Sequence, residues 1–175
     1  VVTERHISPQ GAEHFTNIML PADAVAFVCI GSIGKMALTS QPSFSNQQIN
    51  SVIVDRDQHD PRFVFYALRN NTSQIKGLAG GVATPIINKT SFSNVTLQVP
   101  PLSTQRRIAS ILSAYDDLIE NNARRIAILE GMARRLYDEW FVQFCFPGHE
   151  GVPMVDSKIG KVPEGWELTT VASAV

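Results

Sequence analysis

The 175-residue chain lacks the features that mark several common classes of protein. It has no apolar run close to the roughly 20 residues that a membrane-spanning helix requires. Its first ten residues lack the charged and then apolar layout of a secretion signal. The net charge of −1 excludes the strong overall basicity of many small nucleic-acid binders. We therefore expect a cytoplasmic protein without a membrane segment, in which any basic surface is local.

Residues that carry catalytic or metal chemistry are few and scattered. Cys29 and Cys145 fit neither a disulfide framework nor a zinc ligand set, so we expect reduced thiols. The three aspartates around His59 lack the glycine and the distal glutamate of a calcium loop. In the segment GSIGKM (31–36), two residues separate the glycines where a phosphate-binding P-loop has four. The absence of a catalytic constellation favours a binding or assembly module.

Residues 1–100 combine short apolar runs with dense glycine, proline and asparagine, which predicts a mixed α and β unit with polar loops. We expect strands over 24–30, 35–38 and 49–54, with a glycine turn at 31–34 between the first two. Pro61 favours the first turn of a helix over 62–71, and a second short helix is expected over 73–78.

Residues 103–144 contain no proline and one glycine, Gly131, which predicts a long helix capped by Ser103. An apolar seam follows the helix in steps of three and four residues, as in a coiled coil. One helix cannot bury such a seam, so we expect a partner helix from another part of the parent protein or from another chain. Asn122 interrupts the seam, either to fix the register or as a tolerated irregularity. The seam residues are Ile108, Ile111, Tyr115, Leu118, Asn122, Ile126, Leu129, Ala133, Leu136 and Trp140.

The C-terminal part changes composition. Residues 147–162 are rich in glycine and proline and predict a linker. The segment VPEGW (162–166) predicts a turn with an aromatic anchor, so residues 163–175 are expected to open a second globular unit. The chain begins at Val1 and stops soon after this unit opens. We therefore expect it to be a piece of a longer protein.

An amide-rich stretch, SNQQIN (45–50), precedes the third predicted strand. Asn and Gln side chains present a donor and an acceptor together, which matches the edge of adenine, while Lys and Arg match guanine or phosphate. The alternative is that these amides bind neighbouring loop backbone and hold the fold. Lys76, Thr84 and Lys89 lie in a second polar stretch with the same two interpretations.

Seven short segments are individually weak signals but form a specific ordered set. They are GSIGK (31–35), NQQIN (46–50), TPIINK (84–89), VPPLSTQRRI (99–108), ILSAYDDLIENN (111–122), WFV (140–142) and VPEGW (162–166). In this order, over roughly residues 20–168, the chain resembles the specificity subunit of type I restriction-modification enzymes. Thr104 departs from the family's usual acidic residue, which removes a favourable charge near the helix N-terminus.

The resemblance implies an α+β fold, with a mixed α/β target-recognition domain followed by a long coiled-coil-forming helix. Residues 1–100 would be the later part of one recognition domain, 101–146 the spacer helix, 147–162 a linker and 163–175 the start of the next domain. In that family, each recognition domain reads half of a split DNA site. The helices act as a ruler, pack antiparallel and dock methyltransferase subunits, and a motor-nuclease subunit joins for cleavage.

The resemblance also implies that S-adenosylmethionine, ATP and Mg²⁺ belong to partner subunits, so this chain is expected to bind no cofactor of its own. We expect DNA contacts at Lys35, Gln47, Lys76, Thr84 and Lys89. Contact with the methyltransferase is expected at Arg106, Arg124 and Arg134. The competing hypotheses are a coiled-coil assembly scaffold that binds other proteins without reading DNA, and an enzyme that depends on a nucleotide or a metal.

Overall fold

A computed structural model of the chain describes residues 6–80 and 84–174. The chain divides into two compact units, of which the first ends at Asp116 and the second begins at Asp117. The first unit opens with α1 (Pro9–His14), which Ser8 caps by accepting a hydrogen bond from the Gly11 amide, and with the 3-10 turn η1 (Thr16–Ile18).

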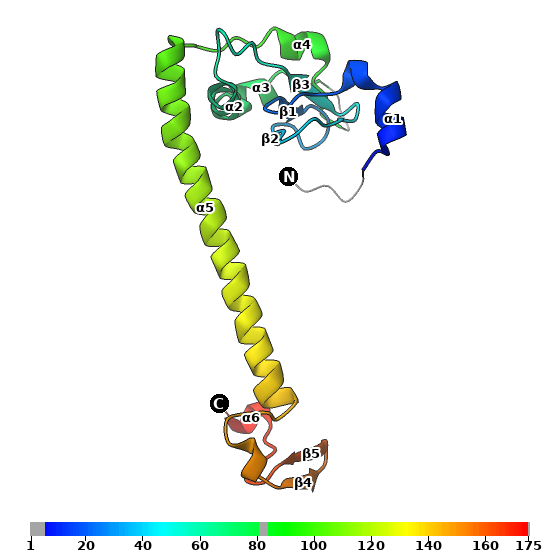
Figure 1. The fold of residues 1–175 in the computed structure, drawn as a ribbon, viewed down its shortest axis with the longest axis vertical. Helices are drawn as coiled ribbons and strands as arrows, with labels where there is room; N and C mark the ends of the chain where they lie inside the picture. The colour runs from blue at the N-terminus through cyan, green and yellow to red at the C-terminus, as the bar shows by residue number, and fades with distance from the viewer. Residues whose placement is uncertain (1–5, 81–83, 175) are drawn as a thin grey trace. The chain divides into compact units, whose positions relative to one another are not determined.

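A three-stranded antiparallel sheet forms the centre of the first unit (Figure 1). Its strands are β1 (Val25–Val28), β2 (Met36–Leu38) and β3 (Ile49–Val52), in the spatial order β2-β1-β3. Phe27 of β1 lies opposite Met36 on one side and opposite Asn50 on the other. The three strands and the glycine turn predicted from the sequence are confirmed, although each strand is shorter than expected.

The core lies on the face of the sheet that carries Val25, Phe27 and Cys29, all of which are buried. Helix α2 (Pro61–Asn70) covers this face with Phe63, Val64 and Leu68. The short helices α3 (Thr72–Lys76) and α4 (Lys89–Ser93) add Ile75 and Phe92. The rings of Phe27 and Phe92 are 4.9 Å apart between centroids. The core therefore joins strands and helices from most of the first unit.

Helix α2 begins where the sequence predicts it. Asp60 caps its N-terminus by accepting a hydrogen bond of 2.9 Å from the Phe63 amide. Pro61 occupies the first turn, where a missing amide hydrogen costs nothing because that amide has no helical partner. The predicted helix over 62–71 is confirmed, and α3 likewise confirms the helix expected over 73–78, shifted by one or two residues.

The long helix α5 (Leu102–Tyr137) has 36 residues and continues into a short π-helical segment, η2 (Asp138–Val142). The helix predicted over 103–144 is therefore confirmed, but it begins at Leu102, so Ser103 is its second residue and not its N-cap. Its only buried residues, Gln105 and Ala109, lie near its beginning. Farther along, the seam residues are exposed. No helix among residues 6–80 and 84–174 is long and apolar enough to cross a membrane.

The second unit has an aromatic cluster around Trp166. The Trp166 ring lies 5.8, 5.2 and 6.0 Å from the rings of Phe141, Phe144 and Phe146, which confirms the predicted aromatic anchor. The range expected as a linker, 147–162, holds the turn η3 (His149–Gly151), strand β4 (Met154–Ser157) and most of β5 (Gly160–Pro163). The two strands pair as a hairpin, and α6 (Val171–Ala174) follows.

Candidate nucleic-acid interface

Antiparallel pairing brings the predicted DNA-contacting loops to one end of the sheet. Strand β1 runs antiparallel to both β2 and β3, so its C-terminal end meets the N-terminal ends of the other two. Lys35 immediately precedes β2, and Gln47 lies two residues before β3. These two side chains come from different loops, and both are exposed.

The segment that follows α3 returns to the same end. The Gly31 amide donates a hydrogen bond of 3.1 Å to the Pro85 carbonyl, and the Ile87 amide donates one of 2.9 Å to the Cys29 carbonyl. Thr84 is the residue before Pro85 and is exposed, so it lies beside the Gly31–Gly34 turn. The structure thus joins the first and third segments of the family resemblance.

Lys76 reaches this turn because Gly34 has no side chain. Gly34 has a φ of +91°, and a Cβ atom built on it would overlap Cγ2 of Thr72 and lie 3.1 Å from Cε of Lys76. Helix α3 therefore packs directly against the turn, and the aliphatic part of Lys76 passes beside Gly34. Lys35 is the next residue along the chain, so both lysines adjoin the same turn.

In the amide-rich stretch 45–50, some side chains form hydrogen bonds within the protein and others do not. The Asn46 Oδ1 accepts a hydrogen bond from the Gln48 amide at 3.0 Å, and the Asn50 Nδ2 donates to the Cys29 Sγ at 3.0 Å. For Asn46, the interpretation that the amides bind neighbouring loop backbone is confirmed, whereas Asn50 binds the side chain of Cys29. Gln47 is exposed, and its side chain makes no hydrogen bond to any residue that the structure describes. Gln47 is thus the better candidate for contact with a ligand.

Lys89 lies near the amide-rich stretch. Asn88 caps α4 by accepting a hydrogen bond of 2.8 Å from the Ser91 amide, and Lys89 is the first residue of that helix. Lys89 and Ser45 line the same hollow, which has a volume of about 580 Å³. The five predicted residues therefore form two neighbouring groups at one end of the sheet. We call this surface, made by Lys35, Gln47, Lys76, Thr84 and Lys89, the lysine edge.

The segments that carry the lysine edge contain basic but no acidic residues. The sequence has no Asp or Glu between residues 24 and 54 or between residues 61 and 115, and these segments form the sheet and its helices. The carboxylates Asp23, Asp55, Asp57 and Asp60 instead precede β1 or follow β3, at the opposite end of the sheet. Lys35, Lys76 and Lys89 have no ion-pair partner among the described residues. A near-neutral chain thus carries a locally basic surface.

The three arginines expected to contact a protein partner are all exposed on α5 but differ in their surroundings. Arg106 lines a hollow of about 260 Å³ with Arg56, His59 and Arg62, at the acidic end of the sheet. Arg124 forms an ion pair of 3.5 Å with Glu120, one turn earlier on the helix. Such an exposed pair contributes little to stability, so Arg124 remains available for a partner.

Within the first unit, two contacts that sequence reasoning missed fix the start of α5 against α2 and the residue before α2. Gln105 is 1% exposed; its Oε1 accepts from the Asp60 amide at 3.0 Å, and its Nε2 donates to the Pro100 carbonyl at 2.8 Å. Farther along, the Tyr66 hydroxyl donates to Asp116 Oδ2 at 2.8 Å. Burial, together with the hydrogen bond to this carboxylate and its charge, raises the pKa of Tyr66 to about 12.

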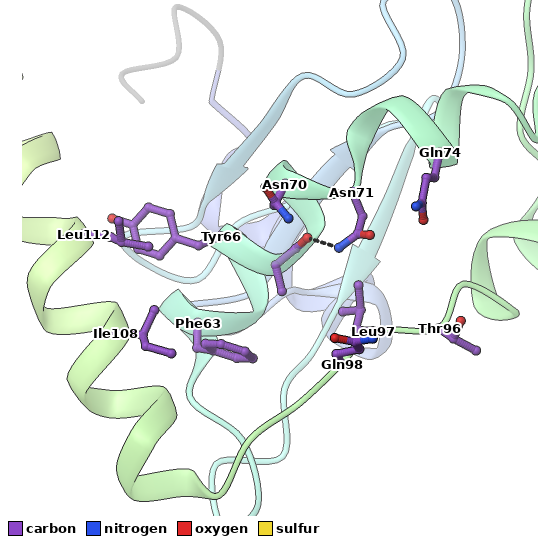
Figure 2. A pocket seen from close by; sticks show the side chains of 11 residues that line it. Phe63, Tyr66, Asn70, Asn71, Gln74, Thr96, Leu97, Gln98, Ile108 and Leu112 are labelled. Atoms are coloured by element: carbon purple, nitrogen blue, oxygen red, sulfur yellow. Dashed lines mark hydrogen bonds between the residues drawn. The ribbon is translucent and has the colours of Figure 1, made fainter.

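Between these contacts, a pocket of about 650 Å³ separates α2 from α5 (Figure 2). Phe63 and Tyr66 of α2 lie across from Ile108 and Leu112 of α5. The side-chain amide of Asn71, at the end of α2, donates to the Ala67 carbonyl at 2.8 Å. The sequence signal for this anchoring was Gln105 itself, a polar residue in the segment VPPLSTQRRI, but one of its partners, Asp60, lies 45 residues away in sequence.

Comparison with known proteins identifies the family. The family model described as "Type I restriction modification DNA specificity domain" matches residues 2–130. The chain belongs to this family. The match includes the three-stranded sheet, the lysine edge and most of α5. It agrees with the resemblance noted from the seven sequence segments.

Two relatives of this specificity domain are described as type I restriction enzyme specificity subunits. The MjaIX subunit of Methanocaldococcus jannaschii is 27% identical over 167 residues, which cover 94% of this chain and 38% of the relative. The HindI subunit of Haemophilus influenzae is 33% identical over 127 residues, which cover 68% of this chain and 28% of the relative. The chain thus spans less than two fifths of the length of these relatives.

A solved structure shares the fold of the specificity domain. It is the S subunit of a type I restriction-modification system from M. genitalium, with a TM-score of 0.64 and 23% sequence identity. The similarity covers 70% of this chain and 33% of that chain. The mixed α+β unit with a long helix is therefore the fold of this family, as the sequence predicts.

Proposed function

We propose that this chain reads one half of a bipartite DNA site for a type I restriction-modification complex, with the lysine edge as the reading surface. The observation that carries the proposal is the set of three exposed lysines on a sheet end whose segments contain no carboxylate. Lysine ammonium groups bind the phosphate backbone without regard to sequence. Gln47 offers a free amide, which can donate to and accept from one base edge. Positioning and reading thus occur on one surface.

Helix α5 has the second role, as a spacer and a docking surface. Its exposed apolar seam requires a partner helix, from the same parent protein or from a second copy. Arg106, Arg124 and Arg134 contact methyltransferase subunits, and a motor-nuclease subunit joins for cleavage. In this assembly the chain has no catalytic role, and S-adenosylmethionine, ATP and Mg²⁺ bind to its cytoplasmic partners.

The first experiment maps methylated adenines in DNA exposed to the native subunit and its methyltransferase. The comparison is a subunit in which residues 1–100 have been exchanged for those of a relative. We expect one half of the bipartite methylated motif to change while the other half and the spacing stay the same. An unchanged motif together with failed assembly would refute DNA reading and favour a protein-binding scaffold, the alternative to which the exposed seam of α5 points.

A second experiment tests the residues of the lysine edge. Replacing Lys35 or Lys76 by Ala removes one phosphate contact, so the negative slope of log K against log salt should become shallower by about 0.9 for each. Gln47→Ala should instead reduce discrimination between bases by about 1–3 kcal/mol, with little change in the salt slope. Lys161→Ala, in β5 of the second unit, is the matched control and should change neither quantity. Equal effects of Lys161→Ala and Lys35→Ala would contradict the assignment.

A further inference from the structure

Helix α3 and the glycine turn meet at a contact that requires a glycine. A Cβ atom built on Gly34 would overlap the methyl carbon, Cγ2, of Thr72 and would lie 3.1 Å from Cε of Lys76. At none of the other glycines that the structure describes would such an atom come closer than 3.0 Å to a neighbour. The Thr72 methyl group therefore occupies the space that a side chain at position 34 would need. We call this contact the Gly34–Thr72 joint.

Both sides of the joint are anchored in the same core. Ile33, the residue before Gly34, is 6% exposed. Ile75, three residues after Thr72, is 1% exposed, and both isoleucines belong to the core cluster of the first unit. The Thr72 hydroxyl donates a hydrogen bond of 3.2 Å to the Leu68 carbonyl, which fixes the orientation of the methyl group on the same carbon. Neither side can therefore move away from the other without disturbing the core.

Two lysines of the lysine edge depend on this joint for their separation. Lys35 follows Gly34 directly in the chain, whereas Lys76 lies about one helical turn after Thr72 on α3. Both lysines are exposed, and neither has an ion-pair partner among the described residues. The turn thus carries one lysine and α3 carries the other. A shift of α3 relative to the turn would therefore change the distance between the two ammonium groups.

We propose that Gly34 and Thr72 are positioning residues, whose joint holds Lys35 and Lys76 at a spacing that lets both bind phosphates of one DNA duplex at the same time. Phosphates repeat regularly along a duplex, so two cations bind together only where their separation suits that repeat. The inference rests on the DNA-reading function proposed above for the lysine edge. It adds to that surface two uncharged residues, which act through the lysines rather than on the DNA.

The salt dependence of DNA binding by the 175-residue chain tests the joint. The probe is a short duplex of random sequence, because phosphate contacts do not depend on sequence. Gly34→Ala forces α3 and the turn apart, so the negative slope of log K against log salt should become shallower by about 0.9 to 1.8, which corresponds to the loss of one or both lysine contacts. If Gly34→Ala does not fold, Thr72→Leu, which enlarges the other side of the joint, is measured in its place.

The double variant Gly34→Ala/Thr72→Ser moves one methyl group from α3 to the turn and so conserves the volume of the joint. Without Cγ2, the atoms nearest to the new Cβ are Cε of Lys76 at 3.1 Å, near the flexible end of its side chain, and Cβ of residue 72 at 3.7 Å. The salt slope should return to its native value. The melting temperature should stay below the native value, because a φ of +91° remains unfavourable for alanine. A merely structural role would not separate these two quantities.

Gly31→Ala is the matched control, because Gly31 lies in the same turn with a φ of +69° but has no atom within 4 Å of a Cβ built on it. This variant carries the backbone strain without the overlap, so its melting temperature should fall while its salt slope stays native. The proposal is overturned if folded Gly34→Ala keeps the native slope, if Thr72→Ser does not restore it, or if Gly31→Ala loses it equally. Should Lys35→Ala and Lys76→Ala also leave the slope unchanged, the lysine edge does not bind DNA and the proposed function fails. Should they make it shallower while Gly34→Ala does not, only the joint is refuted.

Discussion

Replacing Gln105 by Ala should destabilise the first unit more than any other single change of a polar side chain on α5. The substitution leaves the Asp60 amide and the Pro100 carbonyl without their partners, in a site where the side chain is 1% exposed. Each unsatisfied buried group costs about 1–3 kcal/mol, so for the two groups we expect a total loss of about 2–6 kcal/mol. The lost Asp60 contact also weakens the start of α2, because Asp60 is its N-cap.

Urea denaturation followed by far-UV circular dichroism measures this loss as a lower midpoint with an unchanged slope. Both tryptophans, Trp140 and Trp166, lie in the second unit, so their fluorescence provides an internal reference for that unit. Hydrogen exchange at the Asp60 amide provides the local readout, since this amide should lose its protection in the variant.

Gln41→Ala is the matched control for this prediction, because Gln41 is an exposed glutamine of the same unit. It should change the free energy of unfolding by less than about 0.5 kcal/mol. If Gln105→Ala falls within that same range, or if the Asp60 amide keeps its protection, the reasoning that Gln105 anchors α5 is wrong.

Three further predictions concern other contacts. The raised pKa of Tyr66 predicts that its hydroxyl ionises near pH 12. The contribution of this contact to stability should be complete below pH 10 and should decline between pH 10 and 12. Tyr66→Phe should remove this titration from the ultraviolet absorbance, and a Tyr66 titration near pH 10 would contradict the contact with Asp116. Gly34→Ala should destabilise by about 1–3 kcal/mol in thermal unfolding, whereas Gly131→Ala, in open space on α5, should stabilise by up to about 1 kcal/mol. Cys29 should react with a thiol reagent only on unfolding, because burial raises its pKa; rapid reaction in the folded chain would refute this.

The local elements were predictable because their signals are local. Pro61 and the Asp60 cap mark the start of α2, and the run without proline marks α5. The hairpin of β4 and β5 was not expected, because its two four-residue strands lie within a segment of turn-forming composition. The short α4 was also missed, because its five residues include only one apolar side chain, Phe92.

The candidate site was predictable only as a set of residue types. Lys35, Gln47 and Lys89 belong to separate segments of the chain, and their common location follows from tertiary pairing, which single-sequence patterns do not specify. The role of Gln105 depends on Asp60, which is 45 residues away in sequence. The absence of carboxylates from residues 24–54 and 61–115 is visible in the sequence. It indicates a basic surface only once the fold shows that these two segments lie together.

This separation of charge gives the first unit an electric polarity. Three lysines occupy one end of the sheet, and Asp23, Asp55, Asp57 and Asp60 occupy the other, where arginines partly neutralise them. In the field of a polyanion, such a body experiences a torque as well as an attraction, and it rotates before contact so that the lysines lead. Productive encounters should therefore be more frequent at low ionic strength. Added salt should slow association far more than it accelerates dissociation.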